Sequence, residues 1–431
     1  MHFYSTNNKS LTVDFKSATI QGQAPDRGLF FPSEIPQIKE AMIKNIDEYS
    51  KEAIALEVIS PYVGDSIPTK ELEKIVEETI AFDFPLVNIN DRIAALELYH
   101  GPTLAFKDVG ARFMSRCLGH FVKGEKKKVT VLVATSGDTG SAVANGFYNV
   151  EGVDVVILYP SGKVSMTQEA QLTTLGGNIT ALEVDGSFDD CQRMVKNAFG
   201  DEGLRQQLFL TSANSINVAR WLPQQFYYFF AYQQWKDKVN APVISVPSGN
   251  FGNICAGLLA YCSGLPVSHF IAACNENDTI SSYLSSGVYE SKASVPTISN
   301  AMDVGHPSNF VRILELFNNE VGSIRKIMSG YSISDEETRE TIERVYRKKS
   351  YLLDPHGAVG YIGLERYLSQ HQGKGLFLET AHPVKFYDVI EPVIKEKVSM
   401  PESIAGLLKK EKKSTKIPAE DGALREVLLR R

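Results

Sequence analysis

Lys107 is a lysine in a setting that suggests chemistry. It follows the apolar residues Leu104, Ala105 and Phe106 and precedes Asp108, within HGPTLAFKDVGARF. Burial readily suppresses the charge of a lysine amine, and a neutral amine can form a Schiff base with a carbonyl cofactor. The alternative is a residue in the first turn of a helix whose amine reaches water. This stretch taken alone favours that alternative.

A glycine-rich stretch, VISVPSGNFGNICAGLLAY (243–261), has the pattern of an anion site. A β-branched run ends in PSGNFGN, and a helix of small residues follows. Glycines allow close approach of the backbone, and the amides at the helix start point toward a bound phosphate. The stretch lacks the Walker lysine and the dinucleotide spacing, so it suits a single phosphate group. The alternative is a glycine turn needed only for packing.

Three other stretches also carry polar side chains next to a strand. ATSGDTGSAV (134–143) offers hydroxyls and amides for a carboxylate or phosphate, although Asp138 could equally be an N-cap. In TSANSINVARW (211–221), Arg220 could bind phosphate through its planar fork or pair with a surface carboxylate. GLFLETAHPVKF (375–386) is a strand that delivers Thr380 at its carboxyl end, where doubly wound folds bind ligands.

The elements around these stretches repeat as strand, turn and helix from about residue 92. The pattern covers 93–122, 129–150, 153–177 and 178–203. Short buried strands that alternate with helices predict parallel βαβ units, and thus an α/β fold. The aromatic segment 218–237 predicts a core or subunit-interface helix. Residues 286–350 interrupt the rhythm and contain a helix that begins with a capping box, Ser334 to Glu337.

Residues 1–85 contain no nucleophile, ligand cluster or phosphate loop, so they predict a separate structural unit. Its helices are expected at 49–60, stopped by Pro61, and from Thr69 onward. At the other end, residues 391–431 predict a solvated tail of helix and loop. The catalytic part would then span residues 90–390.

Composition excludes several classes of function. The formal net charge of −6 leaves no basic surplus for nucleic acid or an anionic membrane. We find no signal-peptide pattern and no apolar run long enough to span a bilayer. The five scattered cysteines predict reduced thiols and a cytoplasmic protein, which we expect to be a monomer or homodimer. Cys255 and Cys262 lack a matching second pair, so no zinc or other metal site is predicted.

Seven stretches, in order, resemble motifs of the threonine synthases, within the fold-type II (tryptophan synthase β-like) group of pyridoxal-phosphate enzymes. The resemblance covers nearly the whole chain. The seven stretches in this order are far more specific to the family than any one of them alone. The stretches are DRGLFFP (26–32), HGPTLAFKD (100–108), TSGDTGSA (135–142), NSINVAR (214–220), PSGNFGN (247–253), MDVGHPSNF (302–310) and TAHPVKF (380–386).

This resemblance implies two parallel-sheet α/β lobes after a small N-terminal domain, with pyridoxal 5'-phosphate as cofactor. Lys107 matches the cofactor lysine and Thr380 the hydroxyl facing the pyridine nitrogen. The loop around the cofactor phosphate matches Gly249, Asn250, Phe251, Gly252 and Asn253. The substrate phosphate would be held by Asn214, Ser215 and Arg220, and the substrate carboxylate would lie near Ser136 and Thr139.

One residue departs from the wider group. A turn that often has the sequence Ser-Gly-Asn-Thr is Ser-Gly-Asp-Thr here, so Asp138 would approach the phenolic oxygen of the cofactor. Lys163 and Arg112 are weaker candidates for phosphate. Asp303 or Asn309 could reach the mouth of the site.

The resemblance implies conversion of O-phospho-L-homoserine and water to L-threonine and phosphate. Lys107 would carry protons, and two phosphates would be held at once. Two alternatives remain. Another fold-type II enzyme, such as a serine or threonine dehydratase or a cysteine synthase, needs no second phosphate site. A non-catalytic phosphate- or nucleotide-binding protein needs no cofactor lysine. His356, in DPHGAVGYIG, is interpreted as part of a structural turn rather than a metal ligand.

Overall fold

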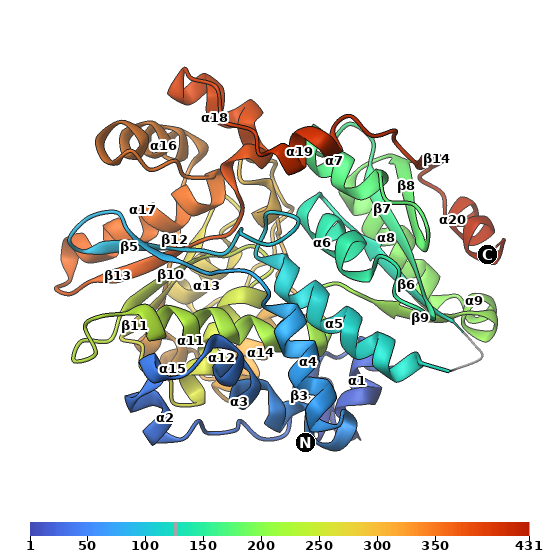
Figure 1. Ribbon diagram of the computed structural model, residues 1–431, viewed down its shortest axis with the longest axis horizontal. Coiled ribbons are helices and arrows are strands. Elements are labelled where there is room, and N and C mark those ends of the chain that lie inside the picture. Colours follow the sequence, from blue (N-terminus) through green and yellow to red (C-terminus); the bar gives the residue numbers. More distant parts are fainter. Residues whose placement is uncertain (125–127, 431) are drawn as a thin grey trace.

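A computed structural model describes residues 1–124 and 128–430 and has two parallel sheets, each in its own lobe (Figure 1). Within these residues the first lobe holds a five-stranded sheet in the order β14-β8-β7-β6-β9, with every pairing parallel. Its strands are β6 (Val129–Ala134), β7 (Val153–Pro160), β8 (Ile179–Asp185), β9 (Phe209–Ser212) and β14 (Ser414–Pro418), and its connecting helices are α6 (Asp138–Phe147), α7 (Met166–Thr173), α8 (Phe188–Gly200) and α9 (Glu202–Gln207). The predicted βαβ units are therefore confirmed.

The second lobe holds a six-stranded sheet in the order β12-β11-β10-β13-β5-β4. Only the edge pair β4–β5 is antiparallel among the pairings described. The strands are β4 (Leu86–Asn88), β5 (Ile93–Glu97), β10 (Val243–Pro247), β11 (His269–Cys274), β12 (Met328–Ser332) and β13 (Gly375–Glu379). Helix α17 (Pro355–Gln370) packs across β10, β11 and β13, and α12 (Gly252–Cys262) follows β10. The carboxyl ends of β5, β10 and β13 thus lie at one edge, where the Lys107, Gly249 and Thr380 stretches begin.

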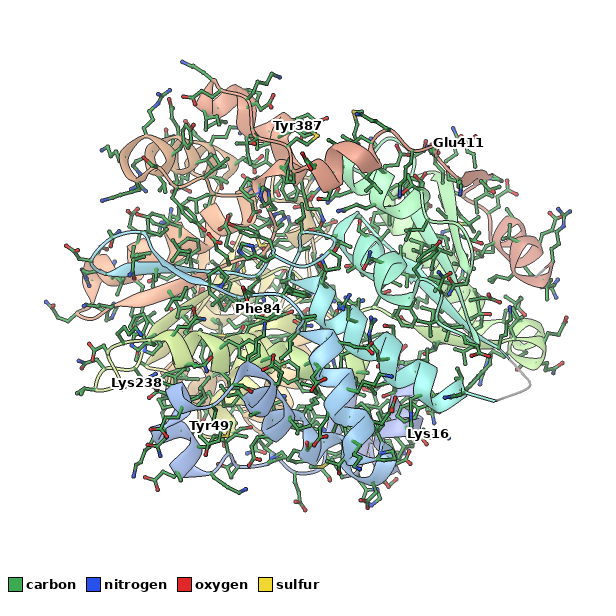
Figure 2. All side chains as sticks on the ribbon, viewed as in Figure 1. Lys16, Tyr49, Phe84, Lys238, Tyr387 and Glu411 are labelled. Carbon is green, nitrogen blue, oxygen red and sulfur yellow. The ribbon has the colours of Figure 1, made fainter. Side chains whose placement is uncertain are left out.

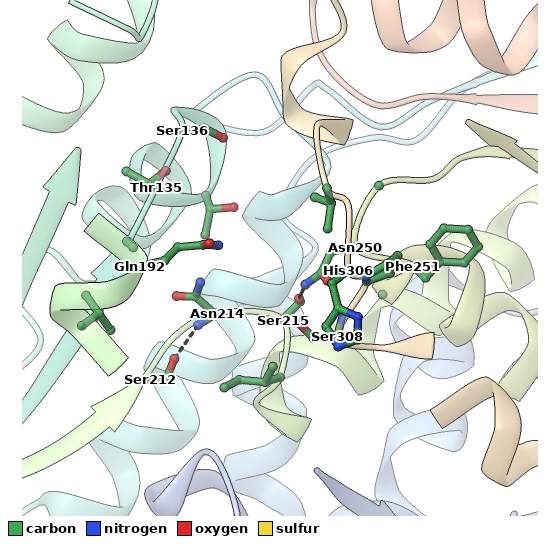
Figure 3. A pocket seen from close by; sticks show the side chains of 18 of the residues that line it. Thr135, Ser136, Gln192, Ser212, Asn214, Ser215, Asn250, Phe251, His306 and Ser308 are labelled. Carbon is green, nitrogen blue, oxygen red and sulfur yellow. Dashed lines mark hydrogen bonds between the residues drawn. The ribbon is translucent and has the colours of Figure 1, made fainter. Parts of the chain in front are cut away.

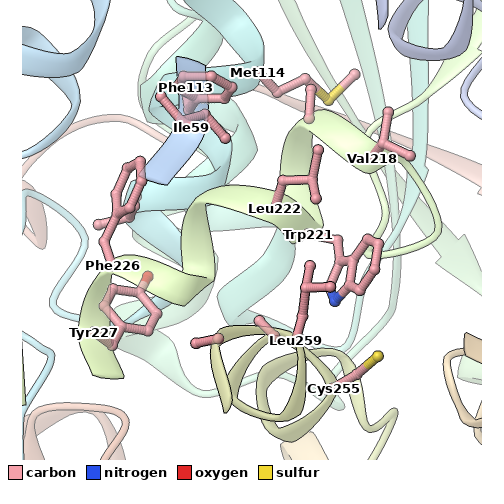
Figure 4. Close-up of a cluster of buried hydrophobic side chains, with 14 of the residues drawn as sticks. Ile59, Phe113, Met114, Val218, Trp221, Leu222, Phe226, Tyr227, Cys255 and Leu259 are labelled. Carbon is pink, nitrogen blue, oxygen red and sulfur yellow. The ribbon is translucent and has the colours of Figure 1, made fainter. Parts of the chain in front are cut away.

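The aromatic segment 218–237 is not one helix. It forms α10 (Val218–Trp221), a 3-10 turn (Leu222–Gln224) and α11 (Gln225–Gln234). Pro223 lies in the turn, because a proline cannot donate the backbone hydrogen bond that continues an α-helix. Figure 4 shows Trp221, Leu222 and Phe226 packed with residues from neighbouring helices, so the prediction of a core segment is confirmed.

The N-terminal residues form a small antiparallel sheet and a group of helices. The sheet has the order β2-β1-β3. The elements are β1 (Phe3–Ser5), β2 (Asn8–Val13), α1 (Phe15–Gln21), β3 (Phe30–Pro32), α2 (Glu40–Lys44), α3 (Lys51–Val63) and α4 (Thr69–Thr79). The predicted stop at Pro61 is wrong, because α3 continues through it. The helix ends instead at Gly64, whose φ of 55° suits glycine.

The N-terminal elements share their core with the rest of the chain. The ring of Phe15 lies 6.4 Å from Phe113 and 6.1 Å from Phe121, centroid to centroid. Asn217 donates from Nδ2 to the carbonyl of Thr19 at 2.9 Å. Further along, Phe84 packs in the interior against Phe230, among the side chains drawn in Figure 2. The separate unit expected from the sequence is therefore packed onto the lobes by apolar contacts.

The segment that interrupts the repeated βαβ pattern contains several helices and the edge strand β12. The helices are α13 (Thr279–Ser286), α14 (Phe310–Leu316), α15 (Val321–Ile327) and α16 (Asp335–Lys349). Ser334 and Glu337 form the predicted capping box, since each side chain bonds the backbone of the other. Between α13 and α14, residues 287–309 form a loop with one 3-10 turn (Asn300–Met302), and Met302 packs against Gly249 just after β10.

The prediction of a helical, solvated tail is wrong. After α18 (Tyr387–Ile394) and α19 (Glu402–Leu407), the chain adds strand β14 to the first sheet, and α20 (Asp421–Leu429) packs beside α8. Ile417, Leu424 and Leu428 are buried in the apolar cluster of that lobe. The basic run 409–413 suggested a solvated segment, but pairing with β8 depends on contacts far away in the chain.

The helices, cysteines and potential metal ligands of the described residues can be compared with the sequence predictions. Across the described residues, none of the helices has the length and apolar character needed to cross a bilayer. All five cysteines are free thiols, and the same residues contain no group of three His, Cys, Asp or Glu side chains that could hold a metal ion.

Candidate active site

A cavity of about 2560 Å³ opens between the two lobes at the carboxyl ends of their strands. The site residues to which the resemblance assigns a role all line it, whereas the weaker candidates Arg112 and Asn309 do not. One group of the site residues belongs to the first lobe and its adjoining segments: Lys107, Ser136, Asp138, Thr139, Asn214, Ser215 and Arg220. The other group belongs to the second lobe: Gly249, Asn250, Phe251, Gly252, Asn253 and Thr380. Figure 3 shows Ser136 across the cavity from Asn250 and Ser215. Residues from widely separated stretches therefore face one space.

Lys107 is the first residue of α5 (Lys107–Val122) and is partly buried in the cavity wall. The preceding turn is tied to β13, because Phe106 donates its N–H to the carbonyl of Thr380 at 2.9 Å. Burial lowers the pKa of Lys107 to about 8, opposed by the negative charge of Asp138 and assisted by the positive charges of Lys385 and Arg220. Lys107 therefore lines the cavity with an amine of which about a tenth is unprotonated at pH 7.

This shift predicts a measurable reactivity. In the cofactor-free chain, acylation of Lys107 by a small reagent is expected to rise with pH and to reach its midpoint near pH 8, because only the neutral amine reacts. Peptide mass spectrometry over a pH series measures the labelled fraction, with the exposed Lys128 as the internal reference. A midpoint for Lys107 near the ordinary lysine value of 10.5 would contradict the burial argument.

The glycine loop fits a phosphate group. A Cβ at Gly249 would lie 2.5 Å from Cα of Met302, so no side chain can occupy that place. Phe251 adopts a left-handed φ of 60°, and α12 starts immediately afterwards with its amides at the cavity. Asn253 is buried and accepts from the hydroxyl of Tyr228 at 2.9 Å, while its Nδ2 has no partner among the described residues. This donor-rich cradle suits the phosphate of a cofactor.

Substitution of Gly249 by alanine is expected to weaken binding of pyridoxal phosphate at least about tenfold, since the added Cβ meets backbone that cannot rotate away. Titration of the cofactor-free chain with pyridoxal phosphate, followed by absorbance, measures the affinity. Gly422→Ala is the matched control, because a Cβ there meets nothing within 4 Å. Equal affinities for the two variants would refute the role of the loop.

Asp138 belongs to a buried ion pair that the sequence did not reveal. Its Oδ1 lies 2.7 Å from Nζ of Lys385 and accepts from Nε2 of Gln168 at 2.9 Å. Lys385 also donates to the carbonyl of Thr103 at 2.8 Å. Burial acts to raise the pKa of Asp138, but the ammonium groups of Lys385 and Lys107 hold it below its usual range. The N-cap alternative is wrong, because Gly137 takes that position and Asp138 makes no capping bond.

Loss of Lys385 leaves the carboxylate of Asp138 buried without its closest cation. Lys385→Met is therefore expected to reduce the free energy of unfolding by about 3–5 kcal/mol. The double variant Asp138→Asn, Lys385→Met removes both charges and is expected to recover most of this loss. Urea unfolding of the cofactor-free chains measures both effects. Absence of recovery in the double variant would show that Lys385 acts by packing alone.

Arg220 is a buried cation that forms no ion pair with any residue described by the structure. Only 3% of its surface is exposed, and burial lowers its pKa to about 10. Its Nη1 donates to the carbonyl of Ala213 at 2.7 Å, whereas its Nε has no partner among the described residues. The alternative of a surface carboxylate pair is therefore wrong. A buried guanidinium with an unused N–H that lines a cavity is suited to an anionic ligand.

The hydroxyls of the 134–143 turn divide into two groups. Thr135 is buried, and its Oγ1 accepts from the N–H groups of Gly137 and Gly140 at 2.9 and 2.8 Å. Ser136 and Thr139 remain partly exposed on the cavity wall. The turn itself is thus held by Thr135, and the other two hydroxyls are available to a ligand.

The weaker candidates from the sequence differ in whether they line the cavity. Arg112 donates to the carbonyl of Glu78 at 2.6 Å and does not line the cavity, whereas the exposed Lys163 does. Asp303 lines the cavity and accepts from Thr297 Oγ1 at 2.7 Å, which holds its own loop. His356 bonds Asp354 through Nδ1 at 2.5 Å and accepts from the N–H of Ala301 at 3.2 Å. Nε2 of His356 therefore holds this loop, and Nδ1 bonds the residue that caps α17.

Family comparisons agree with this geometry. The pyridoxal-phosphate-dependent enzyme model matches residues 85–378, the threonine synthase N-terminal model matches 2–80 and the threonine synthase C-terminal model matches 357–428. Threonine synthase from Escherichia coli strain K12 is 43% identical over 100% of this chain and 99% of its own length. The enzyme from Saccharomyces cerevisiae is 37% identical over 95% of this chain and 94% of its own.

Solved structures show the same relationship. The crystal structure of Escherichia coli threonine synthase matches with a TM-score of 0.93 and 42% identity, and it covers both chains completely. A threonine synthase from Brucella melitensis with bound pyridoxal phosphate matches with a TM-score of 0.93 and 34% identity, over 99% of this chain and 98% of its own. With its cavity lysine, its phosphate cradle and full-length similarity to these enzymes, the chain belongs to the threonine synthase family of pyridoxal-phosphate-dependent enzymes.

Proposed function

We propose that this chain converts O-phospho-L-homoserine and water to L-threonine and phosphate, the last step of threonine biosynthesis, with pyridoxal phosphate as cofactor. The observation that carries the proposal is that one cavity holds two groups suited to anions: the Gly249 loop and the buried Arg220, whose Nε has no partner among the described residues. One site suits the phosphate of the cofactor and the other the phosphate of the substrate. A dehydratase on this scaffold would need only the first.

Pyridoxal phosphate, when bound, supplies a carbonyl that reacts with amines and a ring that stores electrons. Its phosphate would be held by the residues of the Gly249 loop, its phenolic oxygen would face Asp138, and its ring nitrogen would face the hydroxyl of Thr380. A hydroxyl there does not enforce protonation of the ring nitrogen as a carboxylate would. Lys107 would anchor the cofactor and thereby place it between the lobes.

Lys107 also serves as the proton carrier. Once its amine is free, it can take the proton from Cα of the substrate and carry protons to and from Cβ and Cγ. A pKa of about 8 suits both directions of transfer, since the amine is neither permanently charged nor permanently neutral near physiological pH. Desolvation in the cavity wall is what makes this possible.

Substrate orientation follows from the remaining residues. Arg220, with Asn214 and Ser215, would hold the phosphate as it leaves Cγ, and Arg220 would neutralise its charge. Ser136 and Thr139, at the start of α6, would receive the substrate carboxylate. These residues come from different segments that line one cavity, so the substrate would be held at both ends with its reacting carbons toward Lys107.

The organisation of the chain fits this role. We propose residues 1–85 as a supporting N-terminal domain and residues 90–390 as the catalytic domain. Residues 391–431 complete the first lobe through β14. The free thiols support a cytoplasmic location, and we propose a monomer or homodimer, because all the site residues come from one chain.

Phosphate release on addition of O-phospho-L-homoserine, with threonine identified as the co-product, tests the proposal directly. Equimolar phosphate and threonine are expected. A purified chain loaded with pyridoxal phosphate that releases neither would refute it. Release of 2-oxobutanoate from threonine or of pyruvate from serine, without action on phosphohomoserine, would favour a dehydratase instead.

A further inference from the structure

Ser215 lies where two loops of the cavity meet. Its Oγ accepts hydrogen bonds from two side-chain amides: Nδ2 of Asn250 at 2.7 Å and Nδ2 of Asn309 at 3.0 Å. Figure 3 shows the contact between Asn250 and Ser215 within the cavity. Asn250 belongs to the glycine loop, and Asn309 immediately precedes α14.

The direction of both hydrogen bonds is set by groups that can only donate. Oδ1 of Asn250 accepts from the backbone N–H of Ser308 at 2.6 Å. Oδ1 of Asn309 accepts from the guanidinium of Arg312 at 2.7 Å. Neither a backbone N–H nor a guanidinium can accept a hydrogen bond, so neither amide can be turned round. Both NH₂ groups must therefore face Ser215.

A serine hydroxyl has two lone pairs and one proton to donate. Because both lone pairs of Ser215 are engaged, only its O–H remains, and this proton has no acceptor among the described residues. We propose that Ser215 is held as an obligate donor to a phosphoryl oxygen in the cavity, and that Asn309 and Arg312 are the positioning residues that impose this polarity. The identity of the phosphoryl group rests on the proposed function.

Arg312 fixes the orientation of the Asn309 amide, because its guanidinium is itself held in place. It is fully buried, its guanidinium lies 4.4 Å from the ring of Trp221, and no described carboxylate pairs with it. Besides Asn309, it donates to the carbonyls of Ile216 at 2.6 Å and Phe30 at 3.1 Å. This contact gives the DRGLFFP stretch a role: Phe30 anchors the guanidinium from the N-terminal domain.

The hydrogen bonds of Ser215 favour a ligand that accepts a hydrogen bond from it and donates none to it. Ser215 can offer a proton but no lone pair, and the same cavity contains Arg220. A dianionic phosphoryl group meets this requirement, whereas an ammonium or hydroxyl donor would find no acceptor on Ser215. The phosphates of substrate and cofactor share this chemistry, so separate measurements must distinguish them.

Asn309→Asp tests the inference with an isosteric change. The carboxylate can still accept from Arg312, but toward Ser215 it accepts instead of donating and therefore captures the Ser215 proton. Binding of inorganic phosphate to the cofactor-loaded enzyme, measured by calorimetry, is expected to weaken at least about tenfold. Asn88→Asp, on the exposed edge strand β4, adds the same charge away from the cavity and is expected to change nothing.

Testing Asn309→Asp in the Ser215→Ala variant separates two causes of weaker phosphate binding: the reversed hydrogen bond at Ser215 and the repulsion between the new carboxylate and phosphate. Ser215→Ala alone is expected to weaken phosphate binding, and adding Asn309→Asp to it is expected to have much less effect than in the wild type. An equal effect in both backgrounds would overturn the inference. If Asn309→Asp does not fold, as judged by circular dichroism, Asn250→Asp makes the same inversion from the other loop.

Two further measurements identify the phosphoryl group. A raised KM for O-phospho-L-homoserine assigns Ser215 to the substrate, and a weaker affinity of the cofactor-free chain for pyridoxal phosphate assigns it to the cofactor. No change in either, together with unchanged inorganic phosphate binding, refutes the inference. A wild-type enzyme that forms no threonine but shows the phosphate effect would refute the proposed function and leave this inference standing.

Discussion

Lys107→Ala is expected to abolish threonine formation, with a loss of at least about 10³-fold, because both the cofactor anchor and the proton carrier are removed. Pyridoxal phosphate should still bind weakly, since the Gly249 loop is intact and its cradle does not involve Lys107. Phosphate release measures the activity, and cofactor retained after gel filtration measures the binding.

The control for this variant is Lys128→Ala, which removes an exposed lysine whose surface ion pair with Asp154 contributes little to stability. Activity and cofactor content should remain as in the wild type. Retention of more than a tenth of the activity in Lys107→Ala would mean that another group moves the protons. The central assignment would then be wrong.

Arg220→Ala is expected to have the second largest effect. A charge-assisted hydrogen bond to phosphate contributes about 1.5–3 kcal/mol, so KM for O-phospho-L-homoserine should rise about 10- to 150-fold. Cofactor binding should be unaffected, because Arg220 belongs to α10 whereas the Gly249 loop precedes α12. Steady-state phosphate release and cofactor absorbance measure the two properties.

Arg220→Lys refines the test, since it keeps the charge and loses the planar fork. Its KM should fall between those of the wild type and the alanine variant. Arg193→Ala is the matched control, because it breaks exposed ion pairs with Asp190 and Asp421 and an exposed hydrogen bond to the carbonyl of Ala419. An unchanged KM in Arg220→Ala would remove the substrate phosphate from this site and favour an enzyme with one phosphate site.

Local pattern predicts some parts of the candidate site. Gly249 is predictable because a β-branched strand, a glycine turn and a small-residue helix are adjacent in sequence, and this combination needs no distant contact. The same holds for Thr380 after β13 and for the helix start at Lys107. Their meeting in one cavity follows from parallel strands, whose carboxyl ends share an edge.

Lys385 shows what local pattern misses. It lies in TAHPVKF beside Thr380, but nothing near it in sequence indicates a buried cation. Its partners Asp138 and Thr103 belong to other stretches of the chain. A burial penalty that is offset by a distant charge cannot be seen until both groups are placed. Strand β14 was missed for the same reason, because its partner β8 lies far away in the chain.

The sequence by itself therefore predicted the fold class from the alternation of strands and helices. Through the resemblance of seven ordered stretches it also predicted a set of polar residues that the structure brings to one cavity. The tertiary structure alone decided how these groups are charged and oriented: the Asp138–Lys385 pair, the absence of a described counter-ion at Arg220 and the donor polarity of Ser215. Protonation and hydrogen-bond direction depend on burial and on partners brought together by folding, and no local spacing encodes them.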